Sequence, residues 1–161
     1  MRRTAPAAAV TAAALARASE VGLLMKGDLH TEELMHAVAA SQIGLRTTRR
    51  ISHVYLTDVP DYPRPLLVTD AAINISPTFA DKAGIVPPVA GRADILVVPD
   101  LKAGNLHAKQ LTFLAGAEAA GLVLGASVPI ILTSRADSAN TRLASCALGV
   151  LMARAGQAAR V

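Results

Sequence analysis

The sequence predicts an α/β fold with a mainly parallel sheet and flanking helices. Short runs of aliphatic and β-branched residues alternate with segments whose apolar residues recur at helical spacing, a pattern typical of strand–helix–strand units. The 161 residues are 52% hydrophobic and 17% charged, so the chain can fill the core of about one domain. We therefore expect a single domain, residues 1–161, interrupted near 76–92, where prolines and glycines gather.

An alanine-rich segment opens the chain. Residues 5–16 are mostly alanine, the residue with the highest helix propensity, and Pro6 stands where the first helical turn would be. Two arginines before this segment give it the outline of a signal peptide, but alanine makes a weak hydrophobic region and Arg17 interrupts it. We therefore favour a surface helix over a signal peptide.

The remaining elements alternate along the chain. Strands are expected at 21–25, 51–59, 66–69, 95–98 and 128–132. The run 95–98 is continuously aliphatic, which is typical of a strand buried on both faces. Helices are expected where Thr31 and Ser138 supply caps, and from about Asn105 to Ala115.

The last of these helices has a regular apolar stripe. Its members, spaced i, i+3, i+4, i+7 and i+8, are Leu143, Cys146, Ala147, Val150 and Leu151. This spacing predicts the face that packs on the sheet, and it places the cysteine in the core.

Composition argues against several classes of partner. The longest uncharged stretch, 119–134, is shorter than the roughly 20 apolar residues of a membrane-spanning helix, so no membrane partner is expected. The net charge is +4, but only Arg46, Arg49 and Arg50 cluster, and aromatic residues make up 2% of the chain. We therefore expect no nucleic acid, whereas a small anionic ligand explains scattered arginines equally well.

Cysteine and histidine usage completes this picture. The single cysteine, Cys146, excludes a disulfide framework and a cysteine-based zinc site, and it favours a cytoplasmic location. The four histidines show no i, i+4 pair, so we expect no metal site.

Polar residues follow four of the predicted strands, where open α/β sheets bind their ligands. The candidates at these strand ends are Lys26, Asp70, Asn74, Asp100, Asn105, Ser134 and Arg135. Asp70, Asp100 and Ser134 are also well explained as caps of helices or turns. An arginine at the top of a buried strand is costly unless an anion or acid meets it, so Arg135 is the strongest anion candidate.

Several longer motifs resemble, in order, those of the phosphate acetyl/butyryltransferase family. They occupy residues 44–47, 52–54, 67–77, 94–101, 103–105, 116–121 and 128–138. The resemblance covers nearly all of the chain from Leu24 onward. It is closest to the butyryl-type branch and to the transferase half of enoyl-CoA hydratase/phosphate acetyltransferase proteins.

The resemblance implies transfer of an acyl group between CoA and orthophosphate, giving acyl phosphate and CoA. Acyl-CoA and phosphate would be the partners, with CoA as a substrate and no tightly bound cofactor. The implied fold is isocitrate/isopropylmalate dehydrogenase-like, and the implied assembly is a homodimer.

The resemblance also implies roles for residues. It carries the family's catalytic pair onto Ser134 and Arg135, and Thr31 joins the strand-end residues as a substrate-binding candidate. In the acetyl branch an aspartate about two helical turns after the pair is assigned as the base. Thr141 occupies that position here, so Asp137, the only acid nearby, is the candidate base.

The chain is short for this family. Family members carry several more strand–helix units between segments that meet here near 76–92, so this stretch is expected to be a deletion junction and the fold incomplete relative to the family. The alternative to a transferase is therefore an inactive remnant that binds CoA or phosphate weakly or not at all.

Overall fold

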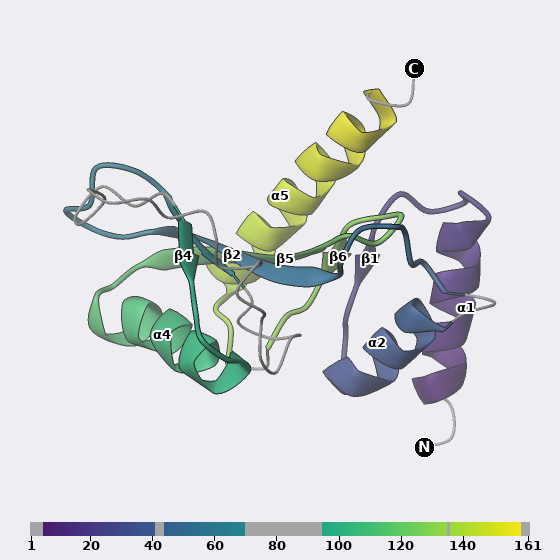
Figure 1. Cartoon of the computed structure of the whole chain (residues 1–161), viewed down its shortest axis with the longest axis horizontal. Coiled ribbons are helices and arrows are strands. Elements are labelled where there is room, and N and C mark those ends of the chain that lie inside the picture. Colours follow the sequence, from purple (N-terminus) through teal and green to yellow (C-terminus); the bar gives the residue numbers. More distant parts are fainter. Residues whose placement is uncertain (1–4, 41–43, 70–94, 135, 159–161) are drawn as a thin grey trace. The chain divides into compact units, whose positions relative to one another are not determined.

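The computed structural model describes residues 5–40, 44–69, 95–134 and 136–158 (Figure 1). Four helices and six strands lie within these ranges. The helices are α1 (Ala5–Arg17), α2 (Thr31–Ala39), α4 (Leu101–Leu114) and α5 (Ala139–Ala158). The strands are β1 (Leu24–Met25), β2 (Ser52–Asp58), β3 (Leu66–Thr69), β4 (Ile95–Val97), β5 (Glu118–Leu124) and β6 (Ile130–Ile131). The expected α/β class is confirmed, and the candidate junction near 76–92 lies outside the described residues.

The chain divides into two compact units, which we describe separately. Unit 1 comprises Met1–Ile51 and Leu122–Val161, and unit 2 comprises Ser52–Gly121. Unit 1 therefore contains α1, β1, α2, β6 and α5, and unit 2 contains β2, β3, β4 and α4. The boundary between the units falls within β5.

The sheet is mixed rather than mainly parallel. Its strand order is β1-β6-β5-β2-β3-β4. β1 pairs with β6, and β3 with β4, in parallel, whereas β2 pairs with β3, and β5 with β6, antiparallel. The prediction was wrong because two connections, 59–65 and 125–129, are short. Parallel neighbours need a crossover of about a dozen residues, so connections of this length join antiparallel strands.

Strand β5 has no counterpart among the predicted elements. After Glu118 it continues with two alanines and a glycine, residues that have low strand propensity. The structure explains this composition, because a Cβ atom at Gly121 would lie 3.0 Å from Tyr55 Cε1 and 3.3 Å from His53 Nε2. His53 is fully buried and packs edge-on against Tyr55, with ring centroids 4.5 Å apart. Small residues in β5 thus leave room for this ring pair.

Helix α1 confirms the helix predicted for the alanine-rich segment. It packs against α2, its neighbour in Figure 1, and buries Ala9, Ala13 and Ala16. Because these side chains are single methyl groups, they allow a close approach between the two helices. The alanine content is therefore used for packing as well as for helix propensity.

The two other helix starts differ from the prediction in detail. The N-cap of α2 is His30 rather than Thr31, and the Glu33 carboxylate accepts a 3.1 Å hydrogen bond from the His30 backbone N–H. Helix α4 begins at Leu101, ahead of the predicted start at Asn105, because Asp100 caps it. The Asp100 carboxylate accepts a 2.8 Å hydrogen bond from the Ala103 N–H.

Replacing Asp100 by alanine is expected to lower the free energy of unfolding by about 1 kcal/mol, since an N-cap acceptor is lost. Asp100→Asn keeps an acceptor oxygen and should retain most of this stability. Urea unfolding measures both values. Equal destabilisation by the two variants would contradict the cap as the source of the effect.

The predicted burial of two apolar segments is wrong. Ile95 in β4 is 46% exposed, so the strand is not buried on both faces. In α5 the predicted stripe faces outward, with Leu143 72% and Leu151 63% exposed. The packed face instead carries Ser145, which is 2% exposed, and Gly149.

The packing of α5 on β6 has a steric reason. A Cβ atom at Gly149 would lie only 3.0 Å from Ile131 Cδ1, so the helix backbone comes close to the strand. Such an approach requires small residues, and it turns the leucines of the stripe toward the outside. Cys146 is half-buried, with its Sγ 3.6 Å from Met25 Sδ.

Candidate functional site

The carboxyl ends of β1 and β6 lie side by side in unit 1. The strands pair in parallel, and the Lys26 N–H extends the ladder by donating to the Ile131 carbonyl at 2.9 Å. The Thr133 hydroxyl then donates to the Lys26 carbonyl at 3.0 Å. Lys26 and Ser134 therefore follow neighbouring strand ends at the same edge of the sheet, as the parallel pairing requires.

Ser134 lies in a turn held by reciprocal hydrogen bonds. Its backbone N–H donates to Asp137 Oδ2 at 2.6 Å, and the Asp137 N–H donates back to the Ser134 carbonyl at 3.2 Å. The Ala136 N–H donates to Ser134 Oγ at 3.3 Å. This last contact uses a lone pair of the hydroxyl oxygen, so the hydroxyl hydrogen is not consumed by it.

Asp137 contacts Ser134 through the backbone rather than through the hydroxyl. The aspartate is half-buried, and its Oδ2 holds the turn closed. A base role would therefore use the other oxygen, Oδ1. The carboxylate has in any case a clear structural function, because it satisfies an N–H group just beyond the end of β6.

Lys26 lines a cavity of about 280 Å³ within unit 1. Its ammonium group donates a 3.0 Å hydrogen bond to the Leu29 carbonyl, which folds the side chain over the turn after β1. The apolar lining includes Met25, Leu29 and Leu34, and the alanines of α1 close one side. Asp28 also lines this cavity, so its polar side carries one cation and one acid beside the apolar recess.

The other candidates fall into separate places. Thr31 is the first residue of α2, in unit 1, and is half-buried. Asp100 and Asn105 belong to α4 in unit 2, where Asp100 caps the helix and Asn105 is exposed. The remaining candidates lie outside the described residues: Asp70, Asn74 and Arg135.

Two residues that sequence reasoning did not select contribute to the Ser134 turn. Thr133 joins the strand ends, and Arg142 donates from its Nη2 to the Ser134 carbonyl at 3.4 Å. Arg142 lies in the first turn of α5, and its N–H bonds to the Ser138 carbonyl. A basic residue eight positions after Ser134 carries no signal in the sequence, since only the direction of α5 brings it back.

Thr133→Val is expected to lower the free energy of unfolding by about 1 kcal/mol, because it removes a part-buried hydrogen bond at nearly constant volume. Thr133→Ser keeps the hydroxyl and should lose less. Urea unfolding of the three proteins tests this expectation. A valine variant as stable as the parent would mean that the Lys26 carbonyl does not depend on this bond.

The part of the chain that the structure describes carries neither a cluster of metal ligands nor a membrane-spanning helix. Within this part, no group of three or more His, Cys, Asp or Glu residues could hold a metal ion. Among the helices of the same residues, none has the length and apolar content needed to cross a bilayer.

Comparison with known proteins points to one family. A family model described as "Phosphate acetyl/butaryl transferase" matches residues 86–150. The phosphate acetyltransferase of Rhizobium meliloti is 44% identical, in an alignment that takes in 96% of this chain and 72% of the relative. The phosphate acetyltransferase of Rickettsia prowazekii (strain Madrid E) is 39% identical over 88% of this chain and 62% of its own length. The phosphate butyryltransferase of Clostridium beijerinckii is 28% identical.

The rhizobial alignment also bears on the length of the chain. It extends over 229 residues, although this chain has 161. The relative therefore contains residues that have no counterpart here, in agreement with a chain that is short for its family.

Solved structures support the same fold. A branched-chain phosphotransacylase from Enterococcus faecalis V583 superposes with a TM-score of 0.76 at 24% identity, covering 90% of this chain and 78% of the other. A phosphotransacetylase from Streptococcus pyogenes gives a TM-score of 0.71 at 17% identity. With the extent and identity of the rhizobial match, these findings lead to one conclusion: the chain belongs to the phosphate acetyl/butyryltransferase family.

Proposed function

We propose that this protein is a phosphate acyltransferase, which converts acyl-CoA and orthophosphate into acyl phosphate and CoA. The observation that carries the proposal is the Ser134 turn, which follows Thr133, whose hydroxyl bonds to the Lys26 carbonyl at the joined ends of β1 and β6. Family membership supplies the reaction. The alternative of an inactive remnant finds no support in the relatives, which are named as transferases.

The reaction needs an electrophile to be polarised and a leaving group to be protonated. An oxygen of hydrogen phosphate attacks the thioester carbonyl carbon, a C–O bond forms, and the C–S bond then breaks to release the CoA thiolate, which takes up the proton that the phosphate gives up. The Ser134 hydroxyl is proposed to donate to the oxyanion that develops on the carbonyl oxygen. Its orientation is set by the Ala136 N–H, which occupies the other side of the oxygen.

The charged candidates have complementary roles in this proposal. Arg135 presents a planar fork of donors to phosphate, and Lys26 adds a second positive charge. Asp137 is proposed to exchange the thiol proton through Oδ1, since Oδ2 is engaged by the Ser134 N–H. Substrate binding is further assigned to five residues: Thr31, Asp70, Asn74, Asp100 and Asn105.

The experiment is a thiol-release assay on the purified chain with acetyl-CoA and with butyryl-CoA. We expect free CoA thiol to appear only when orthophosphate is present. Thiol release that does not depend on phosphate would indicate a thioesterase and contradict the proposal. No thiol release from either thioester in the presence of phosphate would contradict it equally.

We also propose the finer features that the family suggests. These are an isocitrate/isopropylmalate dehydrogenase-like fold, a cytoplasmic location, no tightly bound cofactor and a homodimer. The outward stripe of α5 supports the last of these, because Leu143 and Leu151 expose apolar surface that a second copy could cover.

A dimer formed through α5 should dissociate when Leu151 is replaced by glutamate, since a buried unpaired charge is costly. Sedimentation equilibrium measures the mass of the parent and the variant. Lys109→Glu, a charge change at an exposed position of helix α4, is the control and should leave the mass unchanged. A Leu151→Glu protein with the parent's mass would exclude this face as the contact.

A further inference from the structure

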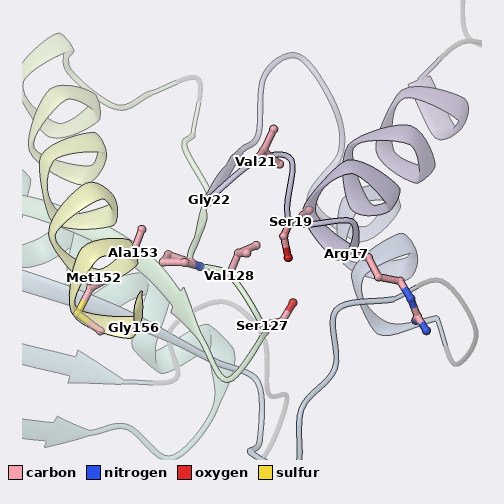
Figure 2. A pocket seen from close by; sticks show the side chains of 11 residues that line it. Arg17, Ser19, Val21, Gly22, Ser127, Val128, Met152, Ala153 and Gly156 are labelled. Carbon is pink, nitrogen blue, oxygen red and sulfur yellow. The ribbon is translucent and has the colours of Figure 1, made fainter. Parts of the chain in front are cut away.

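A second cavity, of about 260 Å³, lies at the other ends of the same two strands (Figure 2). It is lined by Gly22, which precedes β1, and by Val128, which precedes β6, so it faces the amino ends of both strands. Lys26 stands four residues after Gly22, which corresponds to roughly 13 Å of extended chain. All of the residues that line this cavity belong to unit 1.

The polar groups of this cavity are two hydroxyls and one cation. Figure 2 shows the side chains of Ser19 and Ser127 pointing toward one another across the cavity. Arg17 leaves the last turn of α1 at the edge, with its guanidinium turned outward. Arginine side chains have several staggered rotamers, so this outward position is not the only one open to the guanidinium. Among the described residues that line the cavity, none is acidic.

The opposite wall of the cavity is apolar. Val128 lies between the strands and the helix, and Met152 and Ala153 approach from α5 (Figure 2). Gly156, one turn later, leaves space, because a Cβ atom built there meets nothing within 4 Å. A hydrogen-bonding end and an aliphatic end therefore face each other within one small volume.

Ser19 stands in a backbone conformation that normally belongs to glycine. Its φ is 62°, and α1 ends with hydrogen bonds from the Ser19 N–H to the Ala16 carbonyl and from the Glu20 N–H to the Leu15 carbonyl. This is the Schellman ending, in which glycine is preferred at the left-handed position. A serine at this position is strained where a glycine would not be. Its hydroxyl, which a glycine would lack, is directed into the cavity (Figure 2).

We propose that this cavity binds the anion of a short-chain aliphatic acid, at a site distinct from that of the transferase reaction. The Ser19 hydroxyl donates to the carboxylate, Arg17 closes over it with a charge-assisted hydrogen bond, and the aliphatic chain lies against Val128 and Met152. The small volume limits the ligand to a few carbon atoms. The proposal does not depend on the transferase activity.

Butyrate is the probe, and calorimetric titration with the full chain measures its affinity. We expect butyrate to bind. The affinity of the neutral amide butyramide should be at least about tenfold lower, since a hydrogen bond to a charged group is lost. Inorganic phosphate, which lacks the aliphatic part, should also bind more weakly. Equal affinities for butyrate and butyramide would overturn the proposal.

Variants then place the ligand. Gly156→Leu fills the cavity and should abolish butyrate binding, whereas Gly156→Ala adds one methyl group and should retain much of it. Both replace a helical glycine, so neither is expected to lower the melting temperature. Arg17→Gln should weaken binding roughly tenfold, and Arg154→Gln, away from the cavity, should not change it.

Ser19→Gly separates a ligand role from a structural one. It relieves the strained conformation, so the melting temperature should rise, while the loss of the hydroxyl should weaken butyrate binding. Ser134→Ala should leave butyrate binding unchanged, since it alters only the transferase site. Undiminished binding to both Gly156→Leu and Ser19→Gly, or a loss of binding in Ser134→Ala, would overturn the assignment.

Discussion

Ser134→Ala is expected to lower kcat for acyl transfer by about 10²–10³-fold, the cost of removing one donor to a developing oxyanion. The hydroxyl follows β6 in a turn whose backbone is held by Asp137, and its own part in the turn is the 3.3 Å hydrogen bond that its oxygen accepts from the Ala136 N–H. The variant should therefore keep the KM for acyl-CoA close to that of the parent. Steady-state thiol release at varied acyl-CoA and phosphate measures both constants.

The matched control is Ser138→Ala. Each serine oxygen accepts one backbone N–H, at 3.3 Å from Ala136 for Ser134 and at 3.0 Å from Thr141 for Ser138. Both variants therefore lose a local cap of similar kind, but only Ser134 is proposed to act in the reaction. A similar fall in kcat for the two variants would trace the effect to the turn and would remove Ser134 from the mechanism.

Gly125→Ala is expected to lower the free energy of unfolding by about 3 kcal/mol or more. Gly125 has φ 88°, a conformation that costs other residues about 1–2 kcal/mol. In addition, a Cβ atom would overlap the Arg50 carbonyl oxygen and lie 3.0 Å from Ile51 Cα, and backbone cannot move aside as a side chain can. Urea unfolding gives the difference from the parent.

The damage should extend beyond one residue, because Gly125 belongs to a crossing between two loops. The Thr47 hydroxyl donates to the Gly125 carbonyl at 2.6 Å, and the Ser127 N–H donates to the Leu45 carbonyl at 2.8 Å. Gly22→Ala is the control, since a Cβ atom there meets nothing within 4 Å and it should be nearly neutral. If Gly125→Ala were as stable as Gly22→Ala, the close crossing would be wrong.

The strands were most predictable where aliphatic residues run together between turn signals. The strand Leu66–Thr69 has the predicted bounds, and Ser52–Asp58 differs from them by one residue at each end. Strand β5 escaped prediction because alanine and glycine carry no strand signal of their own. Those small residues leave space for the side chains of His53 and Tyr55, which lie more than sixty positions earlier in the chain.

The candidate site shows a similar division. Local sequence was enough to propose that Ser134 and Lys26 follow strands and lie at a sheet edge, and the parallel pairing of β1 with β6 brings them together. It was not enough to separate a cap from a ligand at Asp100, since a carboxylate before a helix suits both. Nor could local sequence show that one carboxylate oxygen of Asp137 would accept a hydrogen bond from the Ser134 backbone N–H.

The sequence by itself determined the α/β class, most of the helices and strands, and the family, because these depend on local propensity and on motifs read along the chain. The tertiary structure alone decided the mixed strand directions, the outward stripe of α5 and the cavity beside Ser19. The physical reason is that the space available between two elements decides which face of a helix packs against the sheet. Gly149 lets α5 approach Ile131 closely. The spacing of apolar residues within α5 does not predict how close this approach is.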